Sequence, residues 1–198
     1  MTTADVGVGV KHPDTTPRTV VDIPLPPKGP TVQIFDLPTN LACIQPDSAG
    51  SENWVALTRG LPGSGKSSLA RLWVQQDPER RVRISRDDLR AELFAAAGRL
   101  TEEQEEVITA TQRARTAVAL RQGCSVVCDD TLLDPAHLTA WEEFLAPFGV
   151  PVVVVDVPTP VDECIRRDRE RGAAGGRQVG EAVIRMLADR YGYPGGQC

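Results

Sequence analysis

The chain has 198 residues, of which 41% are hydrophobic and 25% are charged, and its formal net charge is −5. This length accommodates one α/β core with a short additional segment and is too short for two large domains. The acidic balance argues against a protein that coats nucleic acid through a broadly basic surface, so a polynucleotide would have to bind at a local cluster of positive charge.

Cysteine usage and hydropathy indicate the compartment. Five cysteines occur without metal-ligand spacing, and Cys124 and Cys128 lie in an apolar run typical of a buried strand. No charged start followed by an apolar stretch marks a signal peptide, and no apolar run approaches the ~20 residues that cross a membrane. We therefore expect a cytoplasmic protein that does not contact membranes.

The first part of the chain is rich in proline. Eight of the sixteen prolines precede residue 51, and they prevent long helices and interrupt strand pairing there. We predict that residues 1–50 form a proline-rich N-terminal arm, partly extended or flexible, with short strands at residues 31–36 and 41–44. Residues 51–198 are predicted to form the folded domain.

Beyond residue 53, short apolar runs alternate with segments of helical periodicity. Strands are predicted at residues 54–58, 81–84, 124–129 and 150–157. Helices are predicted at residues 66–76, 87–97, 101–123, 135–148, 160–172 and 180–191, and Thr101 with Gln104 has the spacing of a capping box. This alternation predicts an α/β fold with a parallel sheet that helices cover on both faces.

One motif is specific. The pattern G-x-x-x-x-G-K-[ST] is matched in full by Gly60-Leu61-Pro62-Gly63-Ser64-Gly65-Lys66-Ser67, between a predicted strand and a predicted helix. Glycines let backbone N–H groups approach phosphate oxygens, and the helix start adds its positive dipole end. We predict that this loop, with Ser68 next to it, binds ATP, that Lys66 contacts the β- and γ-phosphates, and that Ser67 is a ligand of Mg²⁺.

Acidic residues follow two of the predicted strands. Asp87 and Arg90 share a helix face, where the carboxylate could accept the proton of an attacking hydroxyl and the arginine could hold an anion. Acids in a first helical turn also complement the helix dipole without any catalytic role. Asp129 and Asp130 end the third strand on opposite faces, so one of them should point toward the phosphates, but spacing does not say which.

A basic cluster occurs near the end of the chain. Beside the glycine-containing loop at residues 173–176 lie five arginines, Arg166, Arg167, Arg169, Arg171 and Arg177. This pattern predicts a mobile lid that closes over a polyphosphate. The interleaved acids also fit a solvated helix face with ion pairs three and four residues apart.

The order and spacing of these motifs resemble the bacteriophage-type 5′-polynucleotide kinase domain, a P-loop kinase, over residues 54–194. The resemblance rests on the phosphate loop and on Arg86-Asp87-Asp88 with Arg90, Asp130-Thr131 before Asp134-Pro135, and Arg171-Gly172. It implies a P-loop kinase fold and transfer of the γ-phosphate of ATP, with Mg²⁺, to a 5′-hydroxyl end of DNA or RNA. Ser85 and Leu132 depart from it, because they stand where amide side chains are expected.

The resemblance also implies individual roles. Asp87 would be the general base, and Asp130, rather than Asp129, the supporting acid. Arg90 would hold the acceptor's neighbouring phosphate, with Arg86 also on the acceptor side. Arg171, and more weakly Arg167, would contact the donor phosphates together with Lys66 and Ser67.

Two other functions remain open from the sequence. A kinase of this architecture could act on a small-molecule hydroxyl or on a hydroxymethylated base in DNA, and the acidic net charge favours small acceptors. A non-enzymatic nucleotide-binding module, whose proline-rich arm engages a partner, is the other reading. The acids at both expected positions argue against the second.

Overall fold

The sheet is wholly parallel in the part of the chain that the structure, a computed structural model, describes: residues 32–36, 53–95 and 100–192. Its strands lie in the order β1-β5-β2-β4-β3. They are β1 (Val32–Asp36), β2 (Val55–Arg59), β3 (Arg81–Ser85), β4 (Ser125–Asp129) and β5 (Val152–Asp156). The chain passes from β2 to β3 and β4 on one side and then crosses to β5 on the other, which creates a topological switch point beside β2.

The helices connect these strands and cover both faces of the sheet. They are α1 (Lys66–Gln75), α2 (Arg86–Phe94), α3 (Glu102–Arg121), α4 (Pro135–Leu145), α5 (Val161–Ala173) and α6 (Glu181–Tyr191), with a short 3₁₀ turn at Ala146–Phe148. One apolar layer packs α2, α3 and α4 on the sheet, and a second packs α1 on the opposite face through Trp54 and Trp73. Four consecutive valines of β5 are buried because the strand is covered on both faces.

Most predicted elements are confirmed to within a few residues. The capping box at α3 is present, since the Thr101 backbone N–H donates to Gln104 Oε1 at 2.9 Å and Gln104 N–H donates to Thr101 Oγ1 at 3.3 Å. The strand expected at residues 31–36 is β1, which pairs with β5 although it belongs to the predicted arm. The strand expected at residues 41–44 lies outside the described residues, and the domain boundary at residue 50 stays a prediction.

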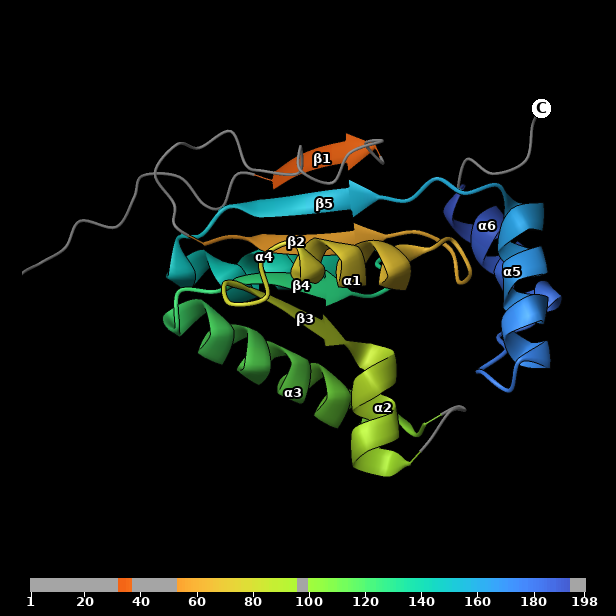
Figure 1. The fold of residues 1–198 in the computed structure, drawn as a ribbon, viewed down its shortest axis with the longest axis horizontal. Helices are drawn as coiled ribbons and strands as arrows, with labels where there is room; N and C mark the ends of the chain where they lie inside the picture. The colour runs from red at the N-terminus through yellow and green to blue at the C-terminus, as the bar shows by residue number, and fades with distance from the viewer. Residues whose placement is uncertain (1–31, 37–52, 96–99, 193–198) are drawn as a thin grey trace, which may run out of the picture.

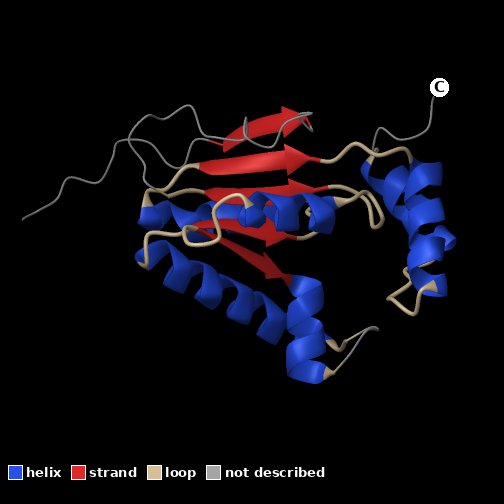
Figure 2. Cartoon of the chain, viewed as in Figure 1, coloured by secondary structure: helices blue, strands red, loops and turns tan. Residues whose placement is uncertain are grey.

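The end of the sheet where the strands terminate is where α2, α5 and α6 are found (Figure 1). Figure 2 shows a tan loop between β5 and α5 at that edge, whereas β3 runs directly into α2. In an open parallel sheet, ligands bind outside the carboxyl ends of the strands, near the switch point. The fold therefore places residues from four connecting segments around one possible binding site.

A buried carboxylate holds α5 and α6 together. Asp168, on α5, is 1% exposed and accepts hydrogen bonds from the backbone N–H groups of Val179, at 3.0 Å, and Gly180, at 2.8 Å, where α6 begins. Both N–H groups precede the first turn of α6, so Asp168 fixes the backbone at the point where α6 begins. Arg171 also donates to Asp168. These bonds hold the pKa of Asp168 below its usual range, against the opposing effect of burial.

We expect Asp168→Asn to lower the free energy of unfolding by about 1–3 kcal/mol at neutral pH, because hydrogen bonds to a charged acceptor are lost. A carboxylate whose folded-state pKa is lowered stabilises the fold above its unfolded pKa of about 4, and this stabilisation disappears as pH falls through the folded value. The difference in the free energy of unfolding between wild type and variant should therefore become smaller below about pH 4. Urea denaturation at neutral and acidic pH measures it.

Asp162→Asn is the matched control, because Asp162 lies on the same helix but is exposed and paired with Arg185. We expect this control to change stability by less than about 0.5 kcal/mol. An Asp168→Asn defect of the same size at every pH would contradict a role for the ionised carboxylate.

Candidate active site

The loop between β2 and α1 has the backbone conformation of a phosphate-binding loop. Gly63 and Gly65 adopt φ values of 85° and 106°, which favour glycine. A Cβ at Gly63 would lie 2.3 Å from the backbone oxygen of Cys164, so no other residue fits there without moving α5. Gly65 is the N-cap of α1 and offers no side-chain cap, so the first N–H groups of this helix are available to an anion.

Lys66 is folded back against this loop. Its side chain is buried, and Nζ donates to the backbone oxygens of Gly60, at 2.9 Å, and Leu61, at 2.8 Å, and lies 3.4 Å from Ser64 Oγ. Burial lowers the pKa of Lys66 to about 8, although nearby carboxylates act in the opposite direction: Asp129, Asp130 and Asp87. A buried ammonium surrounded by acids is an electrostatic centre that a polyanion such as a triphosphate would stabilise further.

The two acids that end β4 have different surroundings. Asp129 is buried and accepts from Arg83, with Nε at 2.8 Å and Nη2 at 2.6 Å. Asp130 Oδ1 accepts from the backbone N–H of Thr131 at 2.7 Å, and Oδ2 is 3.7 Å from Arg86 Nε. Burial raises the pKa of Asp130, against the neighbouring cations. Both Arg83 nitrogens donate to one oxygen of Asp129, Oδ2, whereas each oxygen of Asp130 has a neighbour of its own, Thr131 at Oδ1 and Arg86 at Oδ2.

Asp87 lies at the start of α2, which Ser85 caps by accepting from the Asp88 backbone N–H at 3.4 Å. Asp87 Oδ1 accepts from Arg90 Nη1 at 2.8 Å and also from Arg177 Nη1. The side chain is 57% exposed. Because its charge acts on the pKa of Lys66, Asp87 lies within electrostatic range of the phosphate loop.

Arg90 and Arg86 are both held by α3. Arg90 donates to Glu105 through Nε at 2.9 Å and Nη2 at 3.0 Å, which orients its remaining nitrogen toward Asp87. Arg86 donates to Glu105 at 2.6 Å and to Thr109 at 3.0 Å. The donors of Arg86 are thus largely engaged by α3, and its predicted contact with the acceptor stays a prediction.

The arginines of α5 are distributed over three environments. Arg167 Nη1 donates to the backbone oxygen of Ser64 at 3.1 Å and therefore reaches the phosphate loop. Arg171 donates to buried Asp168, the carboxylate that also accepts from the backbone where α6 begins. Arg166 forms ion pairs with Glu163 and Glu170, three and four residues away, as in the second interpretation of this cluster, whereas Arg169 pairs with Glu181 on α6.

Several contacts at this site were not predicted. Arg177 reaches Asp87, ninety residues away, and not one of the sequence patterns connects them. Glu105 joins Arg86 and Arg90 from α3, whose capping box gives no sign of a role at the site. Arg83 had one weak signal, because it is a charged residue between apolar neighbours in a short strand.

Leu132, one of the two departures from the kinase pattern, has an unusual backbone conformation. Its φ is 44°, in the left-handed region that asparagine tolerates better than leucine. This conformation costs leucine roughly 1–2 kcal/mol. The side chain is buried in the apolar layer under α2, α3 and α4, and its burial offsets that cost.

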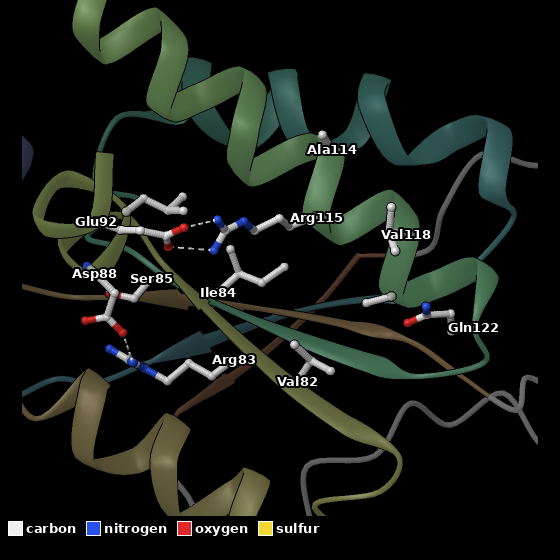
Figure 3. Close-up of a pocket in the computed structure, with 12 residues that line it drawn as sticks. Val82, Arg83, Ile84, Ser85, Asp88, Glu92, Ala114, Arg115, Val118 and Gln122 are labelled. Carbon is white, nitrogen blue, oxygen red and sulfur yellow. Dashed lines mark hydrogen bonds and ion pairs between the residues drawn. The ribbon is translucent and has the colours of Figure 1, made fainter. Parts of the chain in front are cut away.

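A cavity of about 590 Å³ lies on the outer side of β3, between α2 and α3 (Figure 3). Figure 3 shows Arg83 and Asp88 paired at one side and Glu92 paired with Arg115 across the opening. No residue of the phosphate loop lines it. The cavity is therefore separate from the site around Lys66.

None of the described helices is both long and apolar enough to cross a membrane. Within the described ranges, no three histidine, cysteine or acidic side chains gather in a way that would bind a metal ion by themselves.

The fold is similar to that of several solved structures. A chain of the Pnkp1/Rnl/Hen1 RNA repair complex matches with a TM-score of 0.66 and 23% identity, over 75% of this chain and 47% of that one. A putative kinase from Chloroflexus aurantiacus matches with a TM-score of 0.56 and 17% identity, over 71% and 80% of the two chains. The Mycobacterium tuberculosis APS kinase CysC, in complex with AMPPNP and APS, matches with a TM-score of 0.50 and 23% identity, over 63% and 73%.

At these identities the likeness establishes the P-loop kinase type of α/β fold, as the sequence predicted, and this chain spans about half the length of the RNA repair chain. The sequence itself gives the family, because residues 55–194, most of the chain, match the model of the AAA domain family AAA_33. The chain belongs to this AAA domain family.

Proposed function

We propose that the protein is an ATP-dependent kinase that transfers the γ-phosphate to a 5′-hydroxyl end of DNA or RNA. The observation that carries this proposal is the position of Asp87, an exposed carboxylate flanked by two arginines and within electrostatic range of Lys66. A phosphate-binding loop alone would serve any nucleotide-binding protein. A carboxylate beside it, with cations placed for an anionic acceptor, is what alcohol phosphorylation requires.

The donor half fits a nucleoside triphosphate. Gly63 and Gly65 leave backbone N–H groups accessible, and the ammonium of Lys66 is bonded only to neutral oxygens that phosphate oxygens can replace. Arg167 and Arg171 supply further positive charge from α5. Ser67 and Asp130 would hold Mg²⁺, which when bound neutralises charge on the β- and γ-phosphates.

In the proposed reaction, the proton of the acceptor hydroxyl passes to the Asp87 carboxylate. The acceptor oxygen forms a bond to the γ-phosphorus while the bond from that phosphorus to the β,γ-bridging oxygen breaks, and ADP leaves. Lys66 and Arg167 stabilise the negative charge on the transferring group and on ADP. Arg90, oriented by Glu105, holds the phosphate that follows the terminal nucleoside.

A small anionic alcohol is the second candidate acceptor. Three exposed arginines of α5 and α6 are paired with acids: Arg166 with Glu163, Arg169 with Glu181 and Arg185 with Asp162. Such pairing leaves no continuous basic track for a long polynucleotide in this segment, so an acceptor no larger than one or two nucleotides would be bound as well.

Transfer of labelled γ-phosphate to a panel of acceptors tests the proposal. The panel contains 5′-hydroxyl oligonucleotides of DNA and RNA, the same oligonucleotides with 5′-phosphate, a hydroxymethylated duplex and small alcohols. We expect transfer to the 5′-hydroxyl ends alone. Clear ATP binding without transfer to any nucleic acid end would refute it, and absence of acceptor-dependent turnover altogether would favour a non-enzymatic nucleotide-binding module.

We expect Asp87→Asn to reduce kcat by at least about 100-fold, the usual contribution of a general base, with little change in ATP binding. Asp88→Asn is the matched control, because the neighbouring carboxylate points to Arg83 and the cavity in Figure 3. Steady-state transfer to a 5′-hydroxyl oligonucleotide measures both. Equal losses in the two variants would indicate a helix-start defect and not catalysis.

Lys66→Met should abolish the rise in melting temperature that ATP with Mg²⁺ produces in the wild type. Without nucleotide, we expect no loss of stability at neutral pH, because burial disfavours the charged lysine. The folded-state pKa of about 8 lies below the unfolded value of about 10.4, so this penalty disappears as pH rises between them.

Wild type should therefore gain stability relative to Lys66→Met between about pH 8 and pH 10. Thermal denaturation at neutral and alkaline pH, with and without nucleotide, provides both measurements. A variant that melts lower than wild type by the same amount at each pH would show that Lys66 stabilises the fold and has no pH-dependent penalty.

A further inference from the structure

Arg177 contacts the acceptor half of the site and not the donor half. The sequence grouped it with four other arginines of a lid over the donor phosphates. In the structure its Nη1 donates to Asp87 Oδ1, at the start of α2. Figure 1 shows the loop that joins α5 to α6 at the end of the sheet from which α2 begins. The segment that carries Arg167 to the phosphate loop thus also carries an arginine to the proposed base.

The loop around Arg177 is anchored on both sides. Before it, the backbone N–H of Gly176 donates to the Arg171 oxygen at 2.9 Å. After it, the Val179 N–H donates to buried Asp168 at 3.0 Å. Both acceptors belong to α5, so the position of Arg177 over Asp87 follows from how α5 is packed.

The two arginines on Asp87 differ in how firmly they are held. Arg90 is bonded twice to Glu105 in addition to Asp87. Among the residues that the structure describes, Asp87 is the polar partner of Arg177, and the pair is exposed, 35% for Arg177 and 57% for Asp87. Exposed ion pairs contribute little to stability, so Arg177 can exchange Asp87 for another anion. The Nη1 atoms of both arginines donate to the same carboxylate oxygen, Asp87 Oδ1. An anion that took the place of this oxygen would therefore be within reach of both arginines.

We propose that Arg177 determines acceptor specificity by binding the phosphate next to the acceptor hydroxyl. This inference rests on the proposed function. When that phosphate takes the Arg177 guanidinium, Asp87 Oδ1 loses one of its two cationic partners and is free to accept the hydroxyl proton. An acceptor without the phosphate leaves Arg177 on Asp87 and keeps the base engaged. The same arginine therefore favours phosphorylated acceptors and disfavours neutral alcohols.

A pair of matched acceptors isolates this effect. Transfer of labelled phosphate from ATP is measured for a nucleoside 3′-phosphate and for the parent nucleoside, both of which carry a 5′-hydroxyl. We expect kcat/KM of wild type to be higher for the phosphorylated acceptor. Arg177→Ala should lower kcat/KM for that acceptor by about 10- to 100-fold, the effect of one charge-assisted interaction, and should not lower it for the parent nucleoside.

Two more variants complete the test. Arg177→Lys keeps the charge and should restore part of the preference. Arg185→Ala removes an arginine of α6 that pairs with Glu181 and Asp162, and it should leave the preference unchanged. The melting temperature and the KM for ATP of all variants are measured beside the transfer rates.

Each outcome has one meaning. An unchanged acceptor preference in Arg177→Ala overturns the inference. Equal losses for both acceptors, with a raised KM for ATP, also overturn it and assign Arg177 to the donor phosphates, while equal losses with a lower melting temperature assign it a structural role. Failure of the wild type to phosphorylate any 5′-hydroxyl overturns the proposed function itself, which the other outcomes leave intact.

Discussion

The site is organised around one buried positive charge, the ammonium of Lys66. Burial makes this charge unfavourable, and the fold compensates it in part with loop carbonyls and with acids from β4 and α2. Those acids in turn require cations, so Asp129 is paired with Arg83 and Asp87 with Arg90 and Arg177. The result is a layer of alternating charges along the carboxyl edge of the sheet, in which a triphosphate would complete the compensation of Lys66.

Sequence reasoning predicted the fold and the phosphate loop because both depend on local patterns. Valine-rich runs predict strands that are covered on both faces, and Thr101 with Gln104 predicts a helix start. Both patterns act through residues close in sequence. The loop pattern is specific in part because its second fixed glycine, Gly65, has a φ of 106°, which other residues rarely adopt. Acceptor contacts are different, since the bond from Arg177 to Asp87 depends on how two distant helices pack, and an arginine in a basic run gives no sign of its partner.

Sequence patterns do not decide the role of a residue type that can serve two purposes. Arg86 follows a strand end and resembles a substrate-binding residue, yet Glu105 and Thr109 hold it against α3. Arg166 and Arg169 look like lid residues but pair with acids, Arg166 within α5 and Arg169 with Glu181 of α6. Sequence shows that such side chains are charged and near the site, whereas their hydrogen-bond partners decide whether they are available to a ligand.

The contact between α5 and the phosphate loop has a thermodynamic consequence. Thr159 Oγ1 and Arg167 both donate to the Ser64 backbone oxygen, at 2.8 and 3.1 Å, and Gly63 packs against the Cys164 backbone. An arginine that folding has already ordered loses little conformational entropy when a phosphate arrives, so more of its interaction energy appears as affinity. Arg167 would then bind a phosphate at a small further cost in side-chain entropy.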